Sequence, residues 1–140
     1  LQPWVRDGVF SFDVDDALRG RARRATSKAF INPGAGWMAA VGPRDVFLKR
    51  WSPVPPVRLH PDHAPAEVYQ KVVTRPDGGR LELENHGAYQ TLKPGQSMQL
   101  REVWQVAPYQ GPPRPGAHRR KLKDLCGPDA TQSRHSSGNQ

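Results

Sequence analysis

The residues in this chain that are best suited to chemistry are two carboxylates, Glu82 and Glu84, within the segment Arg80–Gly87. Leu81 and Leu83 alternate with them, so in a β-strand both acids share one face, because strand side chains change face at every residue. Neighbouring like charges repel each other and make a poor solvent surface. Such a face is useful where it lines a binding groove in which carboxylates contact the ligand or take part in the chemistry. The alternative for each acid is a solvent-facing residue paired with a basic neighbour.

Two further residues are candidates for the same groove. Glu67 lies on a predicted strand that pairs with residues 81–84, so we expect it to line the groove as a substrate-binding residue. His86 directly follows the second strand and precedes Gly87. As an imidazole it can bind a ligand or donate a proton. The alternative is that His86 caps the strand end or lies on the surface.

Cations beside aromatic rings form the second candidate group. Lys49 shares a strand face with Phe47 and Trp51, and Lys28 lies in a similar strand setting. An aromatic ring can stack on the C–H face of a sugar while a nearby cation meets a hydroxyl or carboxylate. We therefore predict Lys28, Lys49 and Trp51 as substrate-binding residues. The alternative places Trp51 in the core and lets Lys49 reach out to water.

Cofactor sites are not indicated. His60, Asp62 and His63 are residue types that bind metals, but they lie in a proline-rich loop with no further ligand in view,. The glycines of Gly34–Gly36 form a turn, and no Lys-Ser/Thr pair or helix follows to hold a phosphate. We predict no metal and no other cofactor.

The elements that must position these residues are short strands separated by Gly and Pro turns. Alternation or β-propensity predicts strands at residues 9–14, 27–31, 37–41, 45–51, 67–73, 81–84 and 97–106,. Asp77-Gly78 is a typical hairpin turn between two of them. Strands at intervals of about ten residues indicate an all-β fold, an antiparallel β-sandwich. Trp37 and Trp104 are expected in its core.

One acid disturbs this pattern in the last predicted strand. Glu102 falls in the register of the apolar residues Met98, Leu100, Trp104 and Val106. Either a β-bulge takes Glu102 out of register, or it is a buried acid that needs a partner. We favour the bulge.

Composition divides the 140 residues into a body, 1–109, and a tail, 110–140. The tail is rich in Pro, Gly and Ser, has few apolar residues and carries half of the net charge of +8, so we predict that it is disordered,. The single cysteine, Cys126, excludes a disulfide within the chain,. No apolar run approaches the roughly 20 residues of a membrane span. The start at Leu1 without a signal peptide suggests a fragment, and the compartment stays open.

Several short motifs occur in an order that resembles a known family. They are Ser27–Lys28, Gly36–Trp37, Phe47–Trp51, Ala66–Tyr69, Leu81–Gly87, Leu92–Gly95 and Glu102–Trp104. Together they span residues 26–107 and resemble an uncharacterised bacterial family of the galactose-mutarotase-like superfamily. The resemblance implies that the body is the C-terminal part of a super-β-sandwich.

The resemblance also implies a role for Glu84. In aldose 1-epimerases the catalytic base is a glutamate on a late strand before a Pro-Gly turn, and Glu84 stands at the matching place before Leu92–Gly95. Such a base removes the proton from the anomeric hydroxyl, while an acid protonates the ring oxygen. The family's acid, a histidine, lies upstream of the region that this chain covers. Glu82 is then the surface residue.

These observations predict a carbohydrate-binding, aldose-epimerase-like domain with Glu84 as sugar contact or general base. Whether it turns over a substrate stays open. One alternative is a non-catalytic structural or interaction module of the same fold. Another is binding of nucleic acid or an acidic surface through the basic tail, which the ordinary charge of the body makes less favourable.

Overall fold

The computed structural model describes residues 4–6, 8–12, 24–73 and 79–127 of the chain. The strands in these ranges are β1 (Trp4–Arg6), β2 (Val9–Ser11), β3 (Arg24–Ile31), β4 (Trp37–Val41), β5 (Asp45–Trp51), β6 (Ala66–Val73), β7 (Gly79–Asn85) and β8 (Glu102–Pro108). A 3-10 turn, η1 (Pro56–Arg58), and a helix, α2 (Pro115–Cys126), complete the elements. The fold is all-β and sandwich-like, as the strand pattern predicted.

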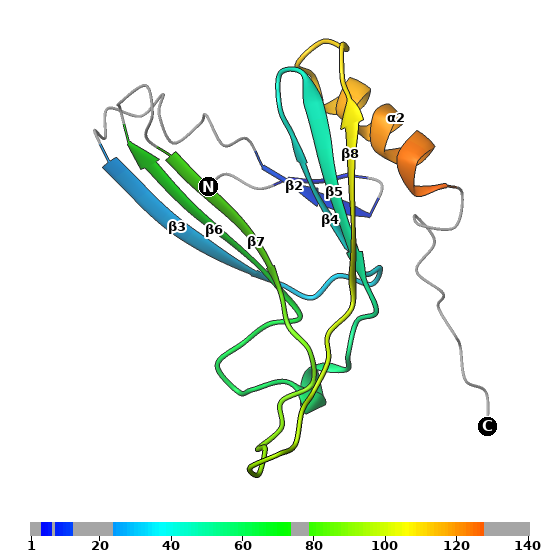
Figure 1. Cartoon of the computed structure of the whole chain (residues 1–140). Coiled ribbons are helices and arrows are strands. Elements are labelled where there is room, and N and C mark those ends of the chain that lie inside the picture. Colours follow the sequence, from blue (N-terminus) through cyan, green and yellow to red (C-terminus); the bar gives the residue numbers. More distant parts are fainter. Residues whose placement is uncertain (1–3, 7, 13–23, 74–78, 128–140) are drawn as a thin grey trace, which may run out of the picture.

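The strands form three antiparallel sheets (Figure 1). One has the order β3-β6-β7, a second the order β4-β5-β8, and β1 and β2 form a small ribbon. The hydrophobic core joins the two larger sheets. It contains Met38 and Trp51 from β4 and β5 together with Ala66 and Val68 from β6, all less than 9% exposed. Burial of these apolar side chains holds the layers together.

The central strand β5 is buried on both of its faces. Val46 and Leu48 have no exposed surface and point to one side, whereas Lys49 and Trp51, both under 8% exposed, point to the other. The β4–β5 hairpin closes with a hydrogen bond from the Gly42 amide to the Asp45 carbonyl. A strand covered on both faces carries an almost continuous apolar run, which here is interrupted by the charged residues Lys49 and Arg50,.

Gly36 makes the crossing from the turn into β4 possible. A β-carbon at this position would lie 2.0 Å from the carbonyl oxygen of Trp51. The Trp51 amide donates a hydrogen bond to the Gly36 carbonyl at 2.9 Å. Only glycine allows the two backbone segments to come this close.

The prediction that residues 110–140 are disordered is wrong for residues 115–126, which form helix α2. Pro115 occupies the first turn, where its missing N–H costs nothing, and Gly127, with φ 75°, ends the helix,. Ala117 packs with Val46 and Tyr109, joined by Leu122 and Leu125. The helix thus covers the face of β5 that lies away from the β3-β6-β7 sheet, and Figure 1 shows it beside β8. Residues 128–140 lie outside the described ranges.

Two expectations about the last strand are also wrong. The strand begins at Glu102 rather than at residue 97, and Met98 and Leu100 lie before it with more than 40% of their surface exposed. Its pairing with β5 runs residue by residue from Trp51↔Glu102 to Asp45↔Pro108, so no bulge occurs. Glu102 instead has a partner, Lys49, at 3.6 Å.

The predicted core position of Trp104 is wrong as well. Its side chain is 66% exposed, and its ring meets Phe47 edge-on at a centroid distance of 5.6 Å. It lies on β8, an edge strand, where the second sheet does not cover it. Of the remaining predictions, strand 9–14 is seen as β2, which ends at Ser11. Phe12 follows it without strand structure, and residues 13–14 lie outside the described ranges, as does the Asp77-Gly78 turn. Within the described residues, we find no helix with the length and apolar character to cross a membrane.

Candidate functional site

The site is centred on Glu67, whose side chain has no exposed surface although it is charged. Glu67 stands opposite Glu84 in the β6–β7 pairing and opposite Phe30 in the β3–β6 pairing. Neighbouring strands therefore bring two carboxylates onto one face of the sheet. Like charges this close require a cation between them.

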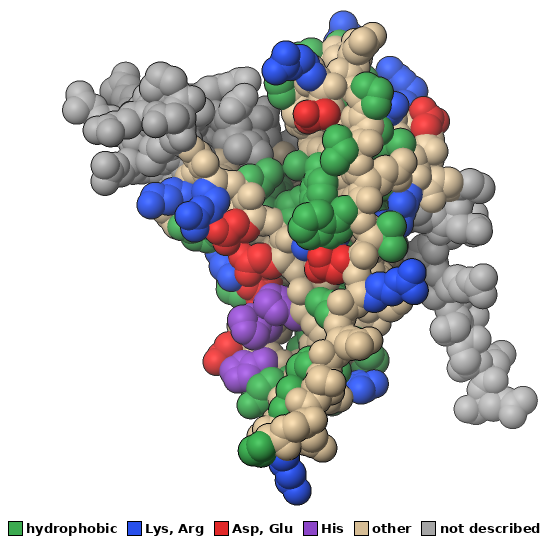
Figure 2. All heavy atoms as spheres, in the orientation of Figure 1, with side chains coloured by type: hydrophobic (Ala, Val, Ile, Leu, Met, Phe, Trp, Pro, Cys, Tyr) green, Lys and Arg blue, Asp and Glu red, His purple; other side chains and the backbone are tan. Residues whose placement is uncertain are grey.

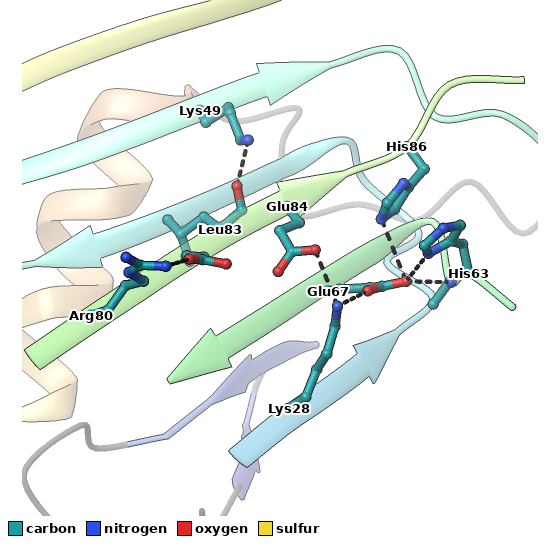
Figure 3. Close-up of polar contacts among 10 residues, drawn as sticks. Lys28, Lys49, His63, Glu67, Arg80, Leu83, Glu84 and His86 are labelled. Carbon is teal, nitrogen blue, oxygen red and sulfur yellow. Dashed lines mark hydrogen bonds and ion pairs between the residues drawn. The ribbon is translucent and has the colours of Figure 1, made fainter. Parts of the chain in front are cut away.

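Lys28 on β3 supplies that cation. Its Nζ lies 2.5 Å from Glu67 Oε2 and 3.2 Å from Glu84 Oε2, and it also stands 5.7 Å from the ring centre of Phe30. Figure 3 shows the ammonium group between the two carboxylates. One residue from each strand of the sheet thus contributes to a single ion-pair network.

Two histidines lie at the other oxygen of Glu67. Nδ1 of His63 is 3.0 Å and Nε2 of His86 is 3.4 Å from Glu67 Oε1. The backbone N–H of Ala64 donates to the same oxygen at 3.0 Å. The two imidazole rings are stacked, with centroids 4.3 Å apart and planes 18° apart. The Glu67 cluster is defined here as Lys28, His63, Glu67, Glu84 and His86.

The pairing of β6 with β7 explains why these histidines meet. His63 lies in the loop just before β6, and His86 comes directly after β7. Antiparallel pairing places the start of one strand beside the end of the other. The hydrogen bond from the His86 amide to the Pro65 carbonyl, 3.3 Å long, fixes this junction.

These contacts set the protonation state of Glu67. Its burial alone would raise the pKa, but the Lys28 ammonium, the Ala64 amide and His63 more than offset this, and the pKa falls to about 2,. The same ion pairs with Glu67 and Glu84 raise the pKa of Lys28. Glu67 is therefore a carboxylate and Lys28 an ammonium at neutral pH.

Solvent reaches the cluster around its buried centre. The side chains of Glu84, Lys28 and His63 are 28%, 35% and 42% exposed. Figure 2 shows acidic side chains adjoining histidine side chains on the side where Figure 1 draws the β3-β6-β7 sheet. The cluster offers a ligand hydrogen-bond acceptors, a cation and imidazoles at one surface.

The structure brings four of the six predicted site residues together: Lys28, Glu67, Glu84 and His86. Lys49 and Trp51 lie elsewhere. Lys49 is buried and donates from Nζ to the Leu83 carbonyl at 2.6 Å (Figure 3). Trp51 is part of the core between the sheets. Trp51 thus follows the alternative reading, whereas Lys49 reaches a carbonyl and Glu102 rather than water.

Two further residues, Glu82 and His63, have observed contacts that can be compared with the sequence predictions. Glu82 pairs with the exposed Arg80 at 3.1 Å, as its alternative reading required. The sequence groups His63 with His60 and Asp62 and gives no direct sign of its contact with Glu67. The pairing of residue 67 with residue 84 is the signal that places residue 63 beside residue 86.

Comparison with known proteins identifies a family. A family model described as a domain of unknown function (DUF4380) matches residues 1–107 of the 140-residue chain. Comparisons with curated proteins and with solved structures give no match. The matched range includes every residue of the Glu67 cluster and ends within β8, before α2.

Proposed function

We propose that this chain, which belongs to the family described as a domain of unknown function (DUF4380), binds a carbohydrate at the open side of the Glu67 cluster. The observation that carries the proposal is the partly exposed carboxylate of Glu84, held beside the partly exposed ammonium of Lys28. A sugar presents adjacent hydroxyls that each donate and accept hydrogen bonds. A carboxylate and an ammonium side by side match two such hydroxyls.

The position of Glu84 supports a more specific role. The motifs of residues 26–107 resemble the galactose-mutarotase-like superfamily, in which a glutamate before a Pro-Gly turn is the catalytic base. Glu84 lies one residue before the end of β7, ahead of the turn Lys93–Gly95, where Gly95 has φ 84° and the Gln96 amide donates to the Lys93 carbonyl. We propose Glu84 as the group that accepts the proton of the anomeric hydroxyl.

Glu67 has a different part in this proposal. It has no exposed surface and a pKa of about 2, so it remains an anion that a sugar does not reach. Its negative charge holds Lys28 in position beside Glu84. Lys28 then contacts the sugar, whereas Glu67 positions Lys28.

Titration of the full chain with a panel of aldohexoses and aldopentoses tests the proposal. The Glu84→Gln variant is expected to bind the recognised sugar about 10- to 100-fold more weakly, since hydrogen bonds to charged groups contribute roughly 1.5–3 kcal/mol. Polarimetry of the same sugar shows whether wild-type protein accelerates mutarotation and whether the variant loses this activity.

Glu82→Gln is the matched control. Glu82 lies two residues away on the same strand and pairs with the exposed Arg80. Its substitution should leave sugar affinity unchanged. Equal affinity of wild type and Glu84→Gln, or an equal loss in both variants, would refute the role assigned to Glu84.

A further inference from the structure

Three side chains of the Glu67 cluster converge on one point that sugar binding does not use. The ligating atoms of His63, Glu67 and His86 all lie within 4.8 Å of one another. They meet at Oε1 of Glu67, on the side away from Lys28, which contacts Oε2. Two imidazoles and a carboxylate form a donor set suited to zinc and related divalent metals.

The distances agree with the size of such a site. Zinc binds histidine nitrogen and carboxylate oxygen at about 2.0–2.2 Å, so two ligands in tetrahedral geometry lie about 3.3–3.5 Å apart. The His86 nitrogen is 3.4 Å and the His63 nitrogen 3.0 Å from Glu67 Oε1. Each nitrogen thus stands close to Oε1 at about the separation that one ion imposes on its ligands, and all three atoms lie within 4.8 Å of one another.

The same His86 nitrogen provides a further observation, which concerns its hydrogen bonding rather than its spacing from the other ligands. Its Nε2 is buried and makes no hydrogen bond within the described part of the chain. A buried polar atom without a hydrogen bond is costly, and a ligand at this atom would remove the cost. This nitrogen lies on the Oε1 side of Glu67.

We propose that His63, Glu67 and His86 bind a divalent transition-metal ion, with Zn²⁺ as the best match. The three ligands leave a coordination position open to water or to an oxygen of a bound molecule. The ring planes, now 18° apart, open so that both lone pairs point at the ion, and the 42% exposed side chain of His63 has room to turn. This site shares only Glu67 with the sugar proposal, in which Glu84 and Lys28 contact the ligand and Glu67 holds Lys28 in place.

The neighbouring cation tunes the site. Lys28 occupies the second oxygen of Glu67, so it orients the carboxylate but also places a positive charge near the metal. Removing that charge by Lys28→Gln should strengthen Zn²⁺ binding severalfold, because like charges repel. If Lys28 acted on Glu67 without its positive charge, Lys28→Gln would not strengthen Zn²⁺ binding.

Zn²⁺ titration by calorimetry of the full chain, after treatment with a chelator and dialysis, tests the proposal. We expect one Zn²⁺ to be bound through the three residues. His63→Phe keeps a ring for stacking but removes the nitrogen, and His86→Phe does the same. Each should weaken binding by at least about 100-fold, above the 10- to 100-fold cost of losing a group that only supports a ligand. Circular dichroism checks that each variant is folded.

Matched controls separate this site from other histidines. His60, whose ring centre lies 5.6 Å from that of His63, and His118 on α2 are both outside the ligand set. His60→Gln and His118→Gln should leave Zn²⁺ affinity unchanged. Co²⁺ bound to wild type should show the visible absorption of a low-coordinate site, and this absorption should be lost in His63→Phe.

Three results would overturn the proposal. They are the absence of Zn²⁺ binding by wild type, unchanged affinity in both Phe variants, and an equal loss in the His60→Gln or His118→Gln controls. Glu84→Gln separates the two proposals, since it should impair sugar binding while it leaves Zn²⁺ affinity within a few-fold. Failure of the sugar titration therefore does not count against the metal site.

Discussion

At the scale of single residues, Glu67 determines the character of the site. A carboxylate without exposed surface is normally costly, and here Lys28, the Ala64 amide and two histidines surround it,. Removing one partner would leave a buried charge less well compensated. We therefore expect a substitution of Glu67 to destabilise the fold more than a substitution of the more exposed Glu84.

The low pKa of Glu67 predicts a particular acid dependence of stability. The pKa is about 2 in the folded chain and 4.5 in its ordinary state, so folding is favoured by ionisation,. This contribution is complete above pH 4.5 and is lost as the pH falls from about 4.5 to about 2. The melting temperature of the metal-free chain should fall more steeply across this range than that of Glu67→Gln.

Glu82→Gln again serves as the control for this measurement, made by circular dichroism in the presence of chelator. The 39% exposed side chain of Glu82 pairs only with Arg80 among the ion pairs of the described residues. Its variant should keep the steep acid dependence of wild type. A Glu67→Gln variant that melts with the same pH profile as wild type would contradict the assigned pKa.

At the scale of elements, Lys49 connects the two larger sheets. It lies on β5, and its Nζ donates to the carbonyl of Leu83 on β7 at 2.6 Å and stands 3.6 Å from Glu102 on β8. The charge thus lies in the layer between the sheets, 6% exposed. A hydrogen bond from a charged donor across the core fixes how the sheets lie relative to one another.

Lys49→Met is expected to destabilise the fold by roughly 1–3 kcal/mol, although methionine has a similar length and is apolar. The reason is that the Leu83 carbonyl loses its donor and Glu102 loses its cation. Urea unfolding of the variant measures this change. Lys71→Met, an exposed lysine on β6, should change stability by less than about 0.5 kcal/mol,. Equal stability of the two variants would show that Lys49 does not join the sheets.

At the scale of the whole described molecule, α2 completes the burial of β5. The helix packs Ala117, Leu122 and Leu125 against the Val46 side, and the Arg50 guanidinium donates to the Leu125 carbonyl at its end. Without this cover, the face of β5 that carries Val46 would be open to water,. The segment assigned to a tail by its composition is therefore part of the fold as far as Cys126.

The double variant Leu122→Ala/Leu125→Ala tests this contribution. Both leucines are partly buried, so the loss should be about 1–3 kcal/mol in total, less than two fully buried leucines would cost,. Urea unfolding again provides the measurement. Lys123→Ala, an exposed position on the same helix, is the control and should have little effect. A double variant as stable as the control would mean that α2 adds nothing to the core.

Local patterns predicted most of the sheet strands because alternation and turn residues act over a few positions. The β4–β5 hairpin and the β6–β7 pair follow from such signals. Helix α2 was missed because its composition is polar and its apolar residues are few. These apolar residues become buried only by packing against Val46 of β5. Trp104 was misplaced because periodicity does not reveal that β8 is an edge strand.

The sequence by itself determined the all-β class and most of the strands, and it predicted four residues of the Glu67 cluster, Lys28, Glu67, Glu84 and His86. Only the tertiary structure decided which of them meet, because an ion pair depends on distances between strands rather than on positions along the chain. Strand pairing joined His63 to Glu67 and His86, and it sent Lys49 and Trp51 into the core instead. Residue types define what chemistry is available, and the register of the sheets decides where it can occur.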